Sequence, residues 1–170
     1  AKSREVEGRI LNATIRRNPS GKYFVSILAE TEVQPLEKTG SSVGIDVSLK
    51  DFAILSTGQL FSNPKWFRTL EEKLGKEQRI LSRRQELALK RKCKLDEAKN
   101  YQKQKRKVAR IHEKIVNART DYLQKISTEI IKNHDVIGIE DLQVSNMLKN
   151  HKLSKAISEA SWSKFRTILE

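Results

Sequence analysis

Two short apolar runs of the chain, residues 42–47 and 135–142, each place an acid directly after a Gly-Ile pair. Runs of β-branched residues like these are typical of strands that are buried on both faces in the middle of a layered α/β sheet. An unpaired carboxylate is costly to bury there, so Asp46 and Glu140 need a cation, a donor network or access to solvent. The matched pair therefore predicts one shared divalent metal site with oxygen ligands. The alternative is that each acid only ends its strand or caps the next segment.

Alternating apolar and polar positions predict a β-hairpin near the start of the chain. Residues 9–17 and 22–32 alternate on either side of a turn signal at residues 18–21, Asn-Pro-Ser-Gly. An isolated hairpin is marginally stable, so we expect it to belong to a sheet elsewhere, such as a separate β-domain. Residues 34–42 contain Pro, Gly and paired serines, and they are predicted to be a linker.

Short strands resume after the linker. Residues 43–49, 51–56 and 59–62 predict an antiparallel meander with the first acid on its first strand. The pair Asn63 and Pro64 is expected to stop the sheet and begin a helix, with Asn as the cap and Pro at the first helical position.

Apolar positions then recur at three- and four-residue steps in two long stretches, one from Trp66 and one from Lys105. This period predicts two amphipathic helices, joined by the polar residues 93–100, that form a long antiparallel hairpin. The second helix leads directly into the second acid run, an arrangement that suits an α/β layer.

The end of the sequence predicts further helical structure. Residues 145–155 are polar and indicate a loop or a short helix, whereas residues 156–169 indicate one terminal helix with an apolar face. Trp162 and Phe165 lie at helical spacing on that face, so we expect them to pack in the core rather than to stack on bases.

The charge of the chain is concentrated on the predicted helical hairpin. The 170 residues carry a formal net charge of +13, and residues 68–119 hold 18 Lys and Arg against 7 Asp and Glu. Such a surplus indicates a polyanionic partner, most commonly nucleic acid. A membrane surface is the weaker interpretation, because no Trp/Phe-rich amphipathic stretch accompanies it, and many of these side chains alternatively form a solvated helix face. The candidates for sequence-independent phosphate contact are Arg79, Arg83, Arg84, Lys90, Arg91, Lys92, Lys94, Lys103, Lys105, Arg106, Lys107 and Arg110.

The rest of the composition excludes several classes of protein. No run of about 18 apolar residues is present, so no segment is expected to span a bilayer. The N-terminus lacks the apolar core of a signal peptide. The single cysteine, Cys93, excludes an internal disulfide and a cysteine-cluster zinc site, which fits a reducing cytoplasm. The chain starts on a short polar lead without Met, so we expect it to be a piece of a longer protein.

Several of these segments resemble the OrfB/TnpB proteins of bacterial insertion sequences. The run GIDVSLKDFA is similar to the first RuvC motif of that family, and IGIEDL is similar to the second. Two later segments resemble the family's sequence downstream of the second motif, and one early segment resembles the last hairpin of its β-barrel, wedge-like domain. The first motif is residues 44–53 and the second is residues 137–142. The two later segments are residues 146–153 and 161–165, and the early segment is residues 19–25.

The resemblance implies an RNase H-like (RuvC) fold with a mixed sheet and a long inserted antiparallel helical hairpin. It implies a wedge-like hairpin at residues 1–38 and an incomplete RuvC-like nuclease domain at residues 39–170, with the helical hairpin at about 64–133. The implied activity is that of a transposon-encoded, RNA-guided DNA endonuclease related to type V CRISPR nucleases, with DNA and a guide RNA as partners. We therefore expect a bacterial, nucleoid-associated protein without a membrane partner; its oligomeric state stays open.

The resemblance also assigns the chemistry. Asp46 matches the first acid and Glu140 the second acid of a catalytic triad that binds Mg²⁺ in a two-metal site. The third acid of the family comes after a four-cysteine zinc ribbon, and both are expected beyond Glu170, so zinc is expected only there. Two Mg²⁺ ions activate water and stabilise the leaving oxygen in phosphodiester hydrolysis. With one acid missing, residues 1–170 are expected to bind nucleic acid with little or no cleavage.

Several other residues are predicted to be structural. Asp141 directly follows Glu140, so in a strand it faces the opposite side of the sheet and is expected to cap or support the fold. His112 and His134 lack a partner at metal-ligand spacing, and Cys93 lacks a base nearby in the sequence. Two alternatives to the nuclease interpretation stay open: a non-catalytic nucleic-acid-binding module, and a transposase or resolvase that acts without a guide.

Overall fold

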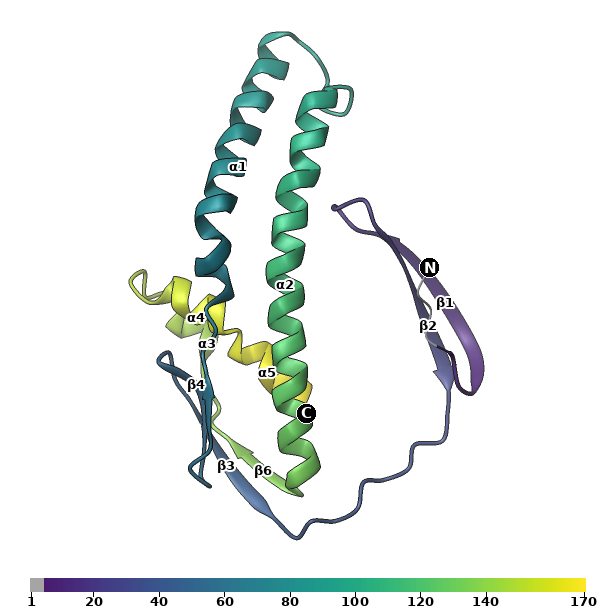
Figure 1. The fold of residues 1–170 in the computed structure, drawn as a ribbon, viewed down its shortest axis with the longest axis vertical. Helices are drawn as coiled ribbons and strands as arrows, with labels where there is room; N and C mark the ends of the chain where they lie inside the picture. Colours follow the sequence, from purple (N-terminus) through teal and green to yellow (C-terminus); the bar gives the residue numbers. More distant parts are fainter. Residues whose placement is uncertain (1–4) are drawn as a thin grey trace. The chain divides into compact units, whose positions relative to one another are not determined.

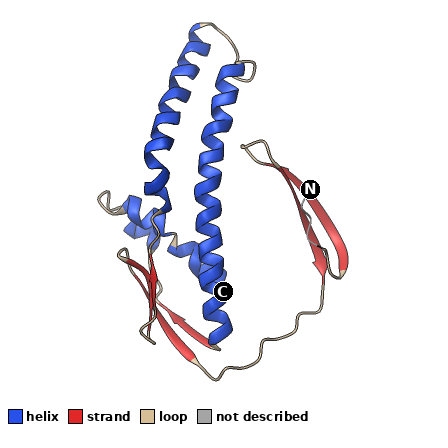
Figure 2. Ribbon diagram, viewed as in Figure 1, coloured by secondary structure: helices blue, strands red, loops and turns tan. Residues whose placement is uncertain are grey.

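A computed structural model of the chain describes residues 5–170, apart from the side chains of residues 66, 67 and 69. The structure is a mixed α/β arrangement of two sheets and two long helices, with shorter helices near the C-terminus (Figures 1 and 2). It divides into two compact units. The first unit comprises Ala1–Leu36 and Lys73–Glu113, and the second comprises Glu37–Glu72 and Lys114–Glu170.

The first unit contains the β-hairpin that the alternating pattern predicts. Strands β1 (Arg9–Arg17) and β2 (Tyr23–Glu30) pair antiparallel around the Asn-Pro-Ser-Gly turn. The turn is closed by two backbone hydrogen bonds, from Asn18 N–H to the Lys22 carbonyl at 2.8 Å and from Gly21 N–H to the Asn18 carbonyl at 2.9 Å. Gly21 has a φ of 91°, a left-handed value that glycine adopts without steric cost.

Two long helices follow the periodic apolar positions. Helices α1 (Trp66–Lys90) and α2 (Lys99–Asn133) run antiparallel, as predicted (Figure 1). In the first unit they bury an apolar seam formed by Leu74, Ala88, Val108 and Ile111. Among the helices that the structure describes, none is long and apolar enough to cross a membrane.

Helix α1 begins two residues later than predicted. Pro64 was expected at the first helical position, yet the helix starts at Trp66 because Lys65 adopts a left-handed φ of 49°. Asn63 serves this turn instead of capping the helix. Its Oδ1 accepts a hydrogen bond from Lys65 N–H at 3.3 Å, and its Nδ2 donates to the Leu49 carbonyl at 3.2 Å.

The second unit is built on a four-stranded mixed sheet in the order β5-β4-β3-β6. The β3-β4 and β4-β5 pairs are antiparallel, which confirms the predicted meander, whereas β3 and β6 are parallel. Only two residues separate the end of helix α2 from β6, so the predicted passage from helix to strand is also confirmed. The strands are β3 (Ser42–Val47), β4 (Asp51–Leu55), β5 (Leu60–Ser62) and β6 (Val136–Ile139).

The sequence prediction that both acid strands are buried on both faces was wrong for the described residues. Along β3, Val43 and Ile45 are buried, whereas Gly44 and Asp46 are exposed. On β6, Val136 is 63% exposed. Helices pack against one face of this sheet only. The sequences of β3 and β6 suggested burial on both faces because glycines, and not polar residues, occupy the positions before the acids on the open face.

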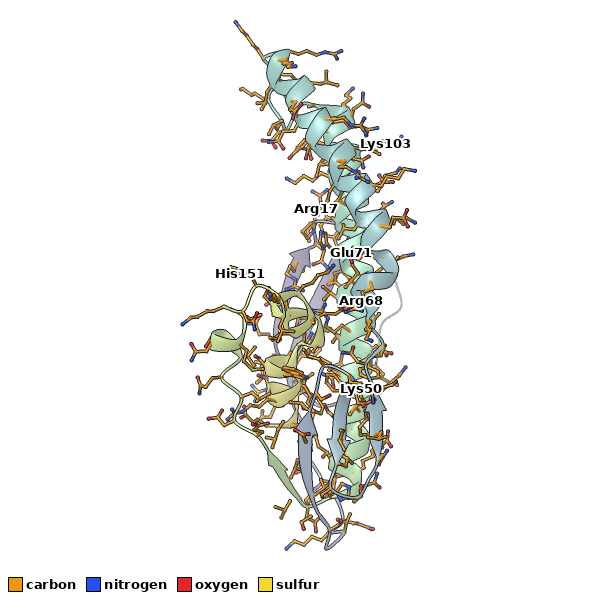
Figure 3. The ribbon with its side chains drawn as sticks, turned by 90° about the vertical axis from the view of Figure 1, so that its left-hand side faces the viewer. Arg17, Lys50, Arg68, Glu71, Lys103 and His151 are labelled. Atoms are coloured by element: carbon orange, nitrogen blue, oxygen red, sulfur yellow. The ribbon has the colours of Figure 1, made fainter. Side chains whose placement is uncertain are left out.

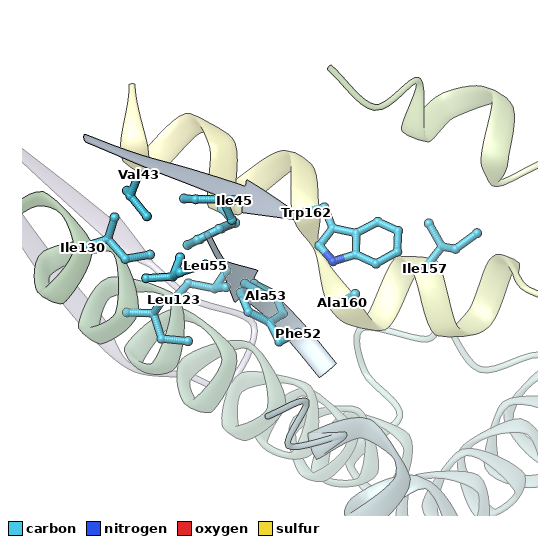
Figure 4. Packing of buried hydrophobic residues seen from close by; sticks show 12 residues of the cluster. Val43, Ile45, Phe52, Ala53, Leu55, Leu123, Ile130, Ile157, Ala160 and Trp162 are labelled. Atoms are coloured by element: carbon cyan, nitrogen blue, oxygen red, sulfur yellow. The ribbon is translucent and has the colours of Figure 1, made fainter. Parts of the chain in front are cut away.

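The core of the second unit lies between the covered face of the sheet, the C-terminal part of α2 and the last helices (Figure 4). Phe52 is its aromatic centre, because its ring makes edge contacts with Phe165 at 5.0 Å and with Tyr122 at 5.5 Å between centroids. Trp162 and Phe165 are both buried, as predicted. Removing a fully buried aromatic side chain costs about 3–5 kcal/mol, so these contacts hold the sheet in place.

The single terminal helix predicted at residues 156–169 is instead two helices. Ser161 interrupts it with φ 58° and ψ 41°, a left-handed conformation that a continuous helix does not accommodate. The break is supported by a hydrogen bond from Arg119 Nη1 on α2 to Ser161 Oγ at 2.9 Å. The helices of this region are α3 (Val144–Met147), α4 (Ser154–Ala160) and α5 (Trp162–Leu169).

Candidate metal site and nucleic-acid interface

The parallel pairing of β3 with β6 brings the two predicted acids together. Ile45 lies opposite Ile139 in this register, and continuing it by one residue sets Asp46 opposite Glu140. Neighbouring strands lie about 4.8 Å apart, so the two side chains start from adjacent positions on the sheet. Because the two isoleucines face the core, the acids next to them in the sequence face the open side, and both are exposed.

A carboxylate clasp before the two strands fixes their register. Asp135 accepts hydrogen bonds from the backbone N–H groups of Thr39 at 2.9 Å and Gly40 at 2.7 Å. These bonds, first that of Thr39 and then that of Gly40, lower the pKa of Asp135 below its ordinary value. The next residue, Ser41, makes two further contacts. Its carbonyl accepts a hydrogen bond from Asp135 N–H at 2.8 Å, and its hydroxyl is hydrogen-bonded to His134 Nδ1 at 2.8 Å. His134 therefore has the structural role that the sequence predicts.

The acid pair, Asp46 and Glu140, lies in a shallow hollow of about 550 Å³ on the open face. Gly44 and Gly138 lie opposite each other on the same face, each two residues before an acid of the pair. Neither carries a side chain, so the floor beside the acid pair is formed by backbone. Ser56 borders this floor and accepts a hydrogen bond from Gly44 N–H on its hydroxyl oxygen at 3.0 Å.

The donor set of the acid pair suits a hydrated, hard divalent cation. Mg²⁺ prefers oxygen ligands, keeps several waters and is held by only one or two carboxylates in many sites. Within residues 5–170 the structure contains no group of three or more His, Cys, Asp or Glu side chains placed to hold a metal ion. The acid pair thus offers two protein ligands and open solvent around them.

The neighbouring acid, Asp141, is used differently. Its carboxylate forms an ion pair with Arg166 on α5, and Arg166 Nε also contacts Glu170 at 2.8 Å. The hydrogen bonds to Glu170 and then to Asp141 raise the pKa of Arg166 above its ordinary value. Asp141 therefore ties the segment after β6 to α5, which agrees with the structural role predicted for it.

The twelve predicted phosphate-contacting residues all lie in one stretch, residues 73–113, which we call the basic arm. Eleven of the twelve are exposed, and Arg84 is half-buried. Arg84 has a structural contact, because its Nη1 donates to the Asn100 carbonyl at 2.8 Å across the helical hairpin. Lys107 lies 3.9 Å from Glu77, a separation that leaves its ammonium largely solvated.

Five of the twelve residues line a groove of about 1180 Å³ that also involves the β-hairpin. Sequence reasoning missed two further cations of this groove, Arg17 and Lys99. Arg17 borders the turn of the hairpin, and no periodicity in the sequence indicates that the turn lies against a helix. Lys99 was predicted to lie in the connection, whereas α2 begins there. The residues of the basic groove, as we call it, are Arg17, Asn18, Pro19, Gly21, Asp96, Lys99, Gln102, Lys103, Lys105, Arg106, Lys107 and Arg110.

Comparison with known proteins agrees with the two motifs. A protein of Streptomyces pristinaespiralis named "Putative RNA-guided DNA endonuclease" is 40% identical over 157 residues, which are 92% of this chain and 37% of that protein. A protein of Escherichia coli K12 named "Putative RNA-guided DNA endonuclease InsQ" is 42% identical over 149 residues, which are 87% of this chain and 34% of that protein. The chain thus spans about a third of the length of these curated relatives.

A family model gives the same assignment. The model OrfB_IS605, described as "Probable transposase", matches residues 25–151 and so includes both acids and the whole basic arm. The match covers well over half of the chain, and the relatives align over most of it. The chain therefore belongs to the OrfB_IS605 family of transposases, the OrfB/TnpB proteins.

Proposed function

We propose that this chain is the nuclease-domain portion of a transposon-encoded, RNA-guided DNA endonuclease with an RNase H-like fold of the RuvC type. One observation carries the proposal: the parallel register of β3 and β6 sets Asp46 opposite Glu140 on an open, glycine-floored face. The mixed sheet and the printed names of the two relatives support it. DNA and a guide RNA are the proposed partners.

In this proposal the acid pair holds Mg²⁺. Asp46 comes from the central strand β3, and Glu140 comes from the end of β6, so each carboxylate is directed by a backbone that the core immobilises. When bound, two Mg²⁺ ions supply an activated water and neutralise the charge on the leaving oxygen of a phosphodiester. The residues of the chain contribute ligand charge and position, and Gly44 with Gly138 leaves room for a polynucleotide backbone beside the acids.

The basic arm supplies affinity in this proposal. Its exposed Lys and Arg side chains neutralise phosphates without reading the base sequence, so binding weakens steeply as the salt concentration rises. In the sequence, helix α1 follows β5 and helix α2 precedes β6, so the arm is an insertion between two strands of the sheet that carries the acid pair. Binding and metal chemistry are thus proposed as tasks of different parts of one chain.

The decisive experiment measures metal binding at the acid pair with a matched control in the adjacent residue. Free Mn²⁺ is followed by its paramagnetic resonance signal during titration of the chain. Glu140→Gln removes one ligand charge and is expected to weaken Mn²⁺ binding by more than about tenfold, because even changes to residues that only orient the ligands cost that much. Asp141→Asn, one residue away but paired with Arg166, is expected to leave Mn²⁺ binding nearly unchanged.

Equal Mn²⁺ affinity of the chain and of both Asp46→Asn and Glu140→Gln would refute the metal site. Thermal unfolding of each variant, recorded by circular dichroism, separates loss of a ligand from loss of the fold. Because both acids are exposed, their amide variants are expected to unfold within a few degrees of the parent chain.

A non-catalytic nucleic-acid-binding module is the second candidate, favoured by one observation. No group of three metal-ligating side chains occurs within residues 5–170, whereas the family resemblance implies a site built from three acids. We therefore expect the chain to bind polynucleotides and to show little or no Mg²⁺-dependent nicking of plasmid DNA. Robust nicking that Asp46→Asn abolishes would contradict this expectation and favour an active two-acid site. Co-purified RNA would argue against a transposase that acts without a guide.

A further inference from the structure

The basic groove is lined from two elements that are distant in the sequence. Arg17, Asn18, Pro19 and Gly21 come from the turn of the β-hairpin, and the other lining residues come from α2 and the segment just before it. Seven of the twelve lining residues are Lys or Arg, one is the acid Asp96, and none is aromatic. Figure 3 labels one cation from each wall, Arg17 and Lys103.

The turn of the hairpin is latched to α2 through one carboxylate. Ser20 is only 3% exposed, and its hydroxyl donates to Glu113 Oε1 at 3.2 Å. Lys22 Nζ forms an ion pair with Glu113 Oε2 at 3.0 Å. The hydrogen bond from Lys22, and after it that from Ser20, lowers the pKa of Glu113, so this carboxylate stays ionised at neutral pH.

Two details show that the turn lies close to the helix and holds its cation. A Cβ atom placed on Gly21 would lie 3.9 Å from Arg106 Cδ, which is van der Waals contact between the turn and α2. The guanidinium carbon of Arg17 lies 5.6 Å from the centre of the Tyr23 ring. A cation over an aromatic face is attracted by the ring quadrupole, so Tyr23 limits the positions that Arg17 samples.

The cations on the helical wall follow one face of α2. Lys99, Lys103, Arg106 and Arg110 are separated by steps of three and four residues, and a span of this length along an α-helix covers about 16 Å. Successive phosphates of a polynucleotide strand fit such a row of cations, whereas base recognition needs ring faces or paired donors and acceptors. The groove therefore suits a backbone and not a base sequence.

We propose that the hairpin turn and α2 form one composite clamp for the phosphodiester backbone of a polynucleotide, with Arg17 as a phosphate ligand and Glu113 as the latch that positions it. This proposal rests on the proposed function, because it assumes that the basic arm binds nucleic acid. It extends the binding surface from the helical hairpin to the β-hairpin. It also assigns Glu113 a positioning role that its charge alone does not predict.

The first test compares neighbouring arginines on the same strand. Arg17→Ala removes a lining cation, whereas Arg16→Ala removes an exposed cation that does not line the groove. Binding of fluorescein-labelled RNA and DNA, each as single strands and as duplexes, is measured by anisotropy over a series of salt concentrations. Arg17→Ala is expected to weaken binding about three- to fivefold and to reduce the salt slope by about one, and Arg16→Ala to do neither. The polynucleotide whose dissociation constant increases most on Arg17→Ala is identified as the one that the clamp binds.

The second test asks whether removing an acidic side chain strengthens or weakens binding of the polynucleotide. Removing a negative charge beside a polyanion site strengthens binding if charge is all that matters. Asp96→Ala, in the lining of the groove, is therefore expected to bind as well as the parent chain or better. Glu113→Ala is expected to weaken binding, because the hairpin turn is released. After that release Arg17→Ala should have no further effect, so the double variant should bind like Glu113→Ala alone.

Several outcomes would overturn the clamp. These are equal losses for Arg16→Ala and Arg17→Ala, stronger binding by Glu113→Ala, or additive losses in the double variant. Weaker binding by Lys103→Ala together with no effect of Arg17→Ala would reject the clamp but would support nucleic-acid binding by the arm. Circular dichroism unfolding of each variant checks that the chain is folded. Glu113→Gln, which keeps a hydrogen-bond acceptor for Ser20, is expected to lose less affinity than Glu113→Ala.

Discussion

The acid pair and the basic groove differ in how strongly each depends on the position of single residues. Asp46 and Glu140 meet because two strands pair in one register, and a shift of one residue would turn either acid toward the core. The basic groove holds seven cations from two elements, so the loss of one leaves most of its charge in place. Metal chemistry thus relies on a rigid sheet, whereas phosphate binding relies on the number of cations.

The largest expected effect comes from breaking the support of the acid pair. Phe165 is fully buried and packs against Phe52 on the covered face of the sheet. Phe165→Ala is expected to lower the free energy of unfolding by about 3–5 kcal/mol, because a buried aromatic side chain leaves a cavity. Denaturant unfolding measures the loss, and Mn²⁺ titration is expected to show a weakened site.

The matched control for this change is Thr167→Ala on the same helix. Thr167 is exposed, and its hydroxyl donates only to the Ser163 carbonyl of the preceding turn at 3.0 Å. Its replacement is expected to change the free energy of unfolding by less than about 0.5 kcal/mol. Similar losses for both variants would contradict the assignment of Phe165 to the support of the sheet.

An intermediate effect is expected from opening the clasp that sets the register. Asp135→Asn keeps the size of the side chain but removes the charge that accepts the N–H groups of Thr39 and Gly40. Because the pKa of Asp135 is lowered in the folded state, its stabilising contribution is present above the unfolded pKa of about 3.9. That contribution is lost as the pH falls through the lowered folded pKa.

The difference in unfolding free energy between the chain and Asp135→Asn is therefore expected at pH 7 and should disappear in acid. Denaturant unfolding at a series of pH values measures it. Asp121→Asn, which affects an exposed pair with Lys125 at 2.7 Å within one helix, serves as the control and is expected to have a smaller effect. A difference for Asp135→Asn that grows toward low pH would show that the carboxylate does not stabilise the clasp.

The smallest effect concerns Tyr122, which lies at the edge of the core beside Phe52. Burial raises its pKa to about 12, and its hydroxyl donates to the Ser62 carbonyl. Its neutral form is favoured in the folded state, so the contribution is complete below about pH 10 and is lost as the pH rises toward 12. Subtracting the ultraviolet titration of Tyr122→Phe from that of the chain should isolate a transition near pH 12. A transition near pH 10 would place this hydroxyl in solvent.

Local sequence patterns predicted the elements of both regions, because each pattern reflects contacts made within a few residues. The two Gly-Ile-acid runs predicted adjacent strands, and β3 and β6 indeed pair with glycine opposite glycine. The periodic apolar positions predicted α1 and α2. Asparagine and serine at the turns were predicted less well. Asn63 donates a hydrogen bond to the Leu49 carbonyl, and Ser161 accepts one from Arg119. The backbone conformations at these two turns therefore depend on partners distant in the sequence.

The remaining differences have the same origin. Whether a strand is covered on one face or two depends on where helices pack, and no residue of β3 or β6 encodes that choice alone. Ser20 sits in a polar turn, yet it is buried, and its hydroxyl donates to Glu113, a partner distant in the sequence. Sequence reasoning therefore predicted that Asp46 and Glu140 lie close together and that most cations of the basic arm are exposed, but it missed Arg17, which the fold brings to the basic groove.

The clasp at Asp135 also bears on how this architecture tolerates change in length. It joins the residues just before β3 to the residue just before β6, so the sheet stays closed at this point while the helical hairpin leaves the sheet after β5 and returns before β6. Doubling the length of a flexible segment whose two ends are held together costs only about 0.6 kcal/mol more in chain entropy. Helical turns added to or removed from the arm are thus expected to leave the spacing of the two carboxylates unchanged.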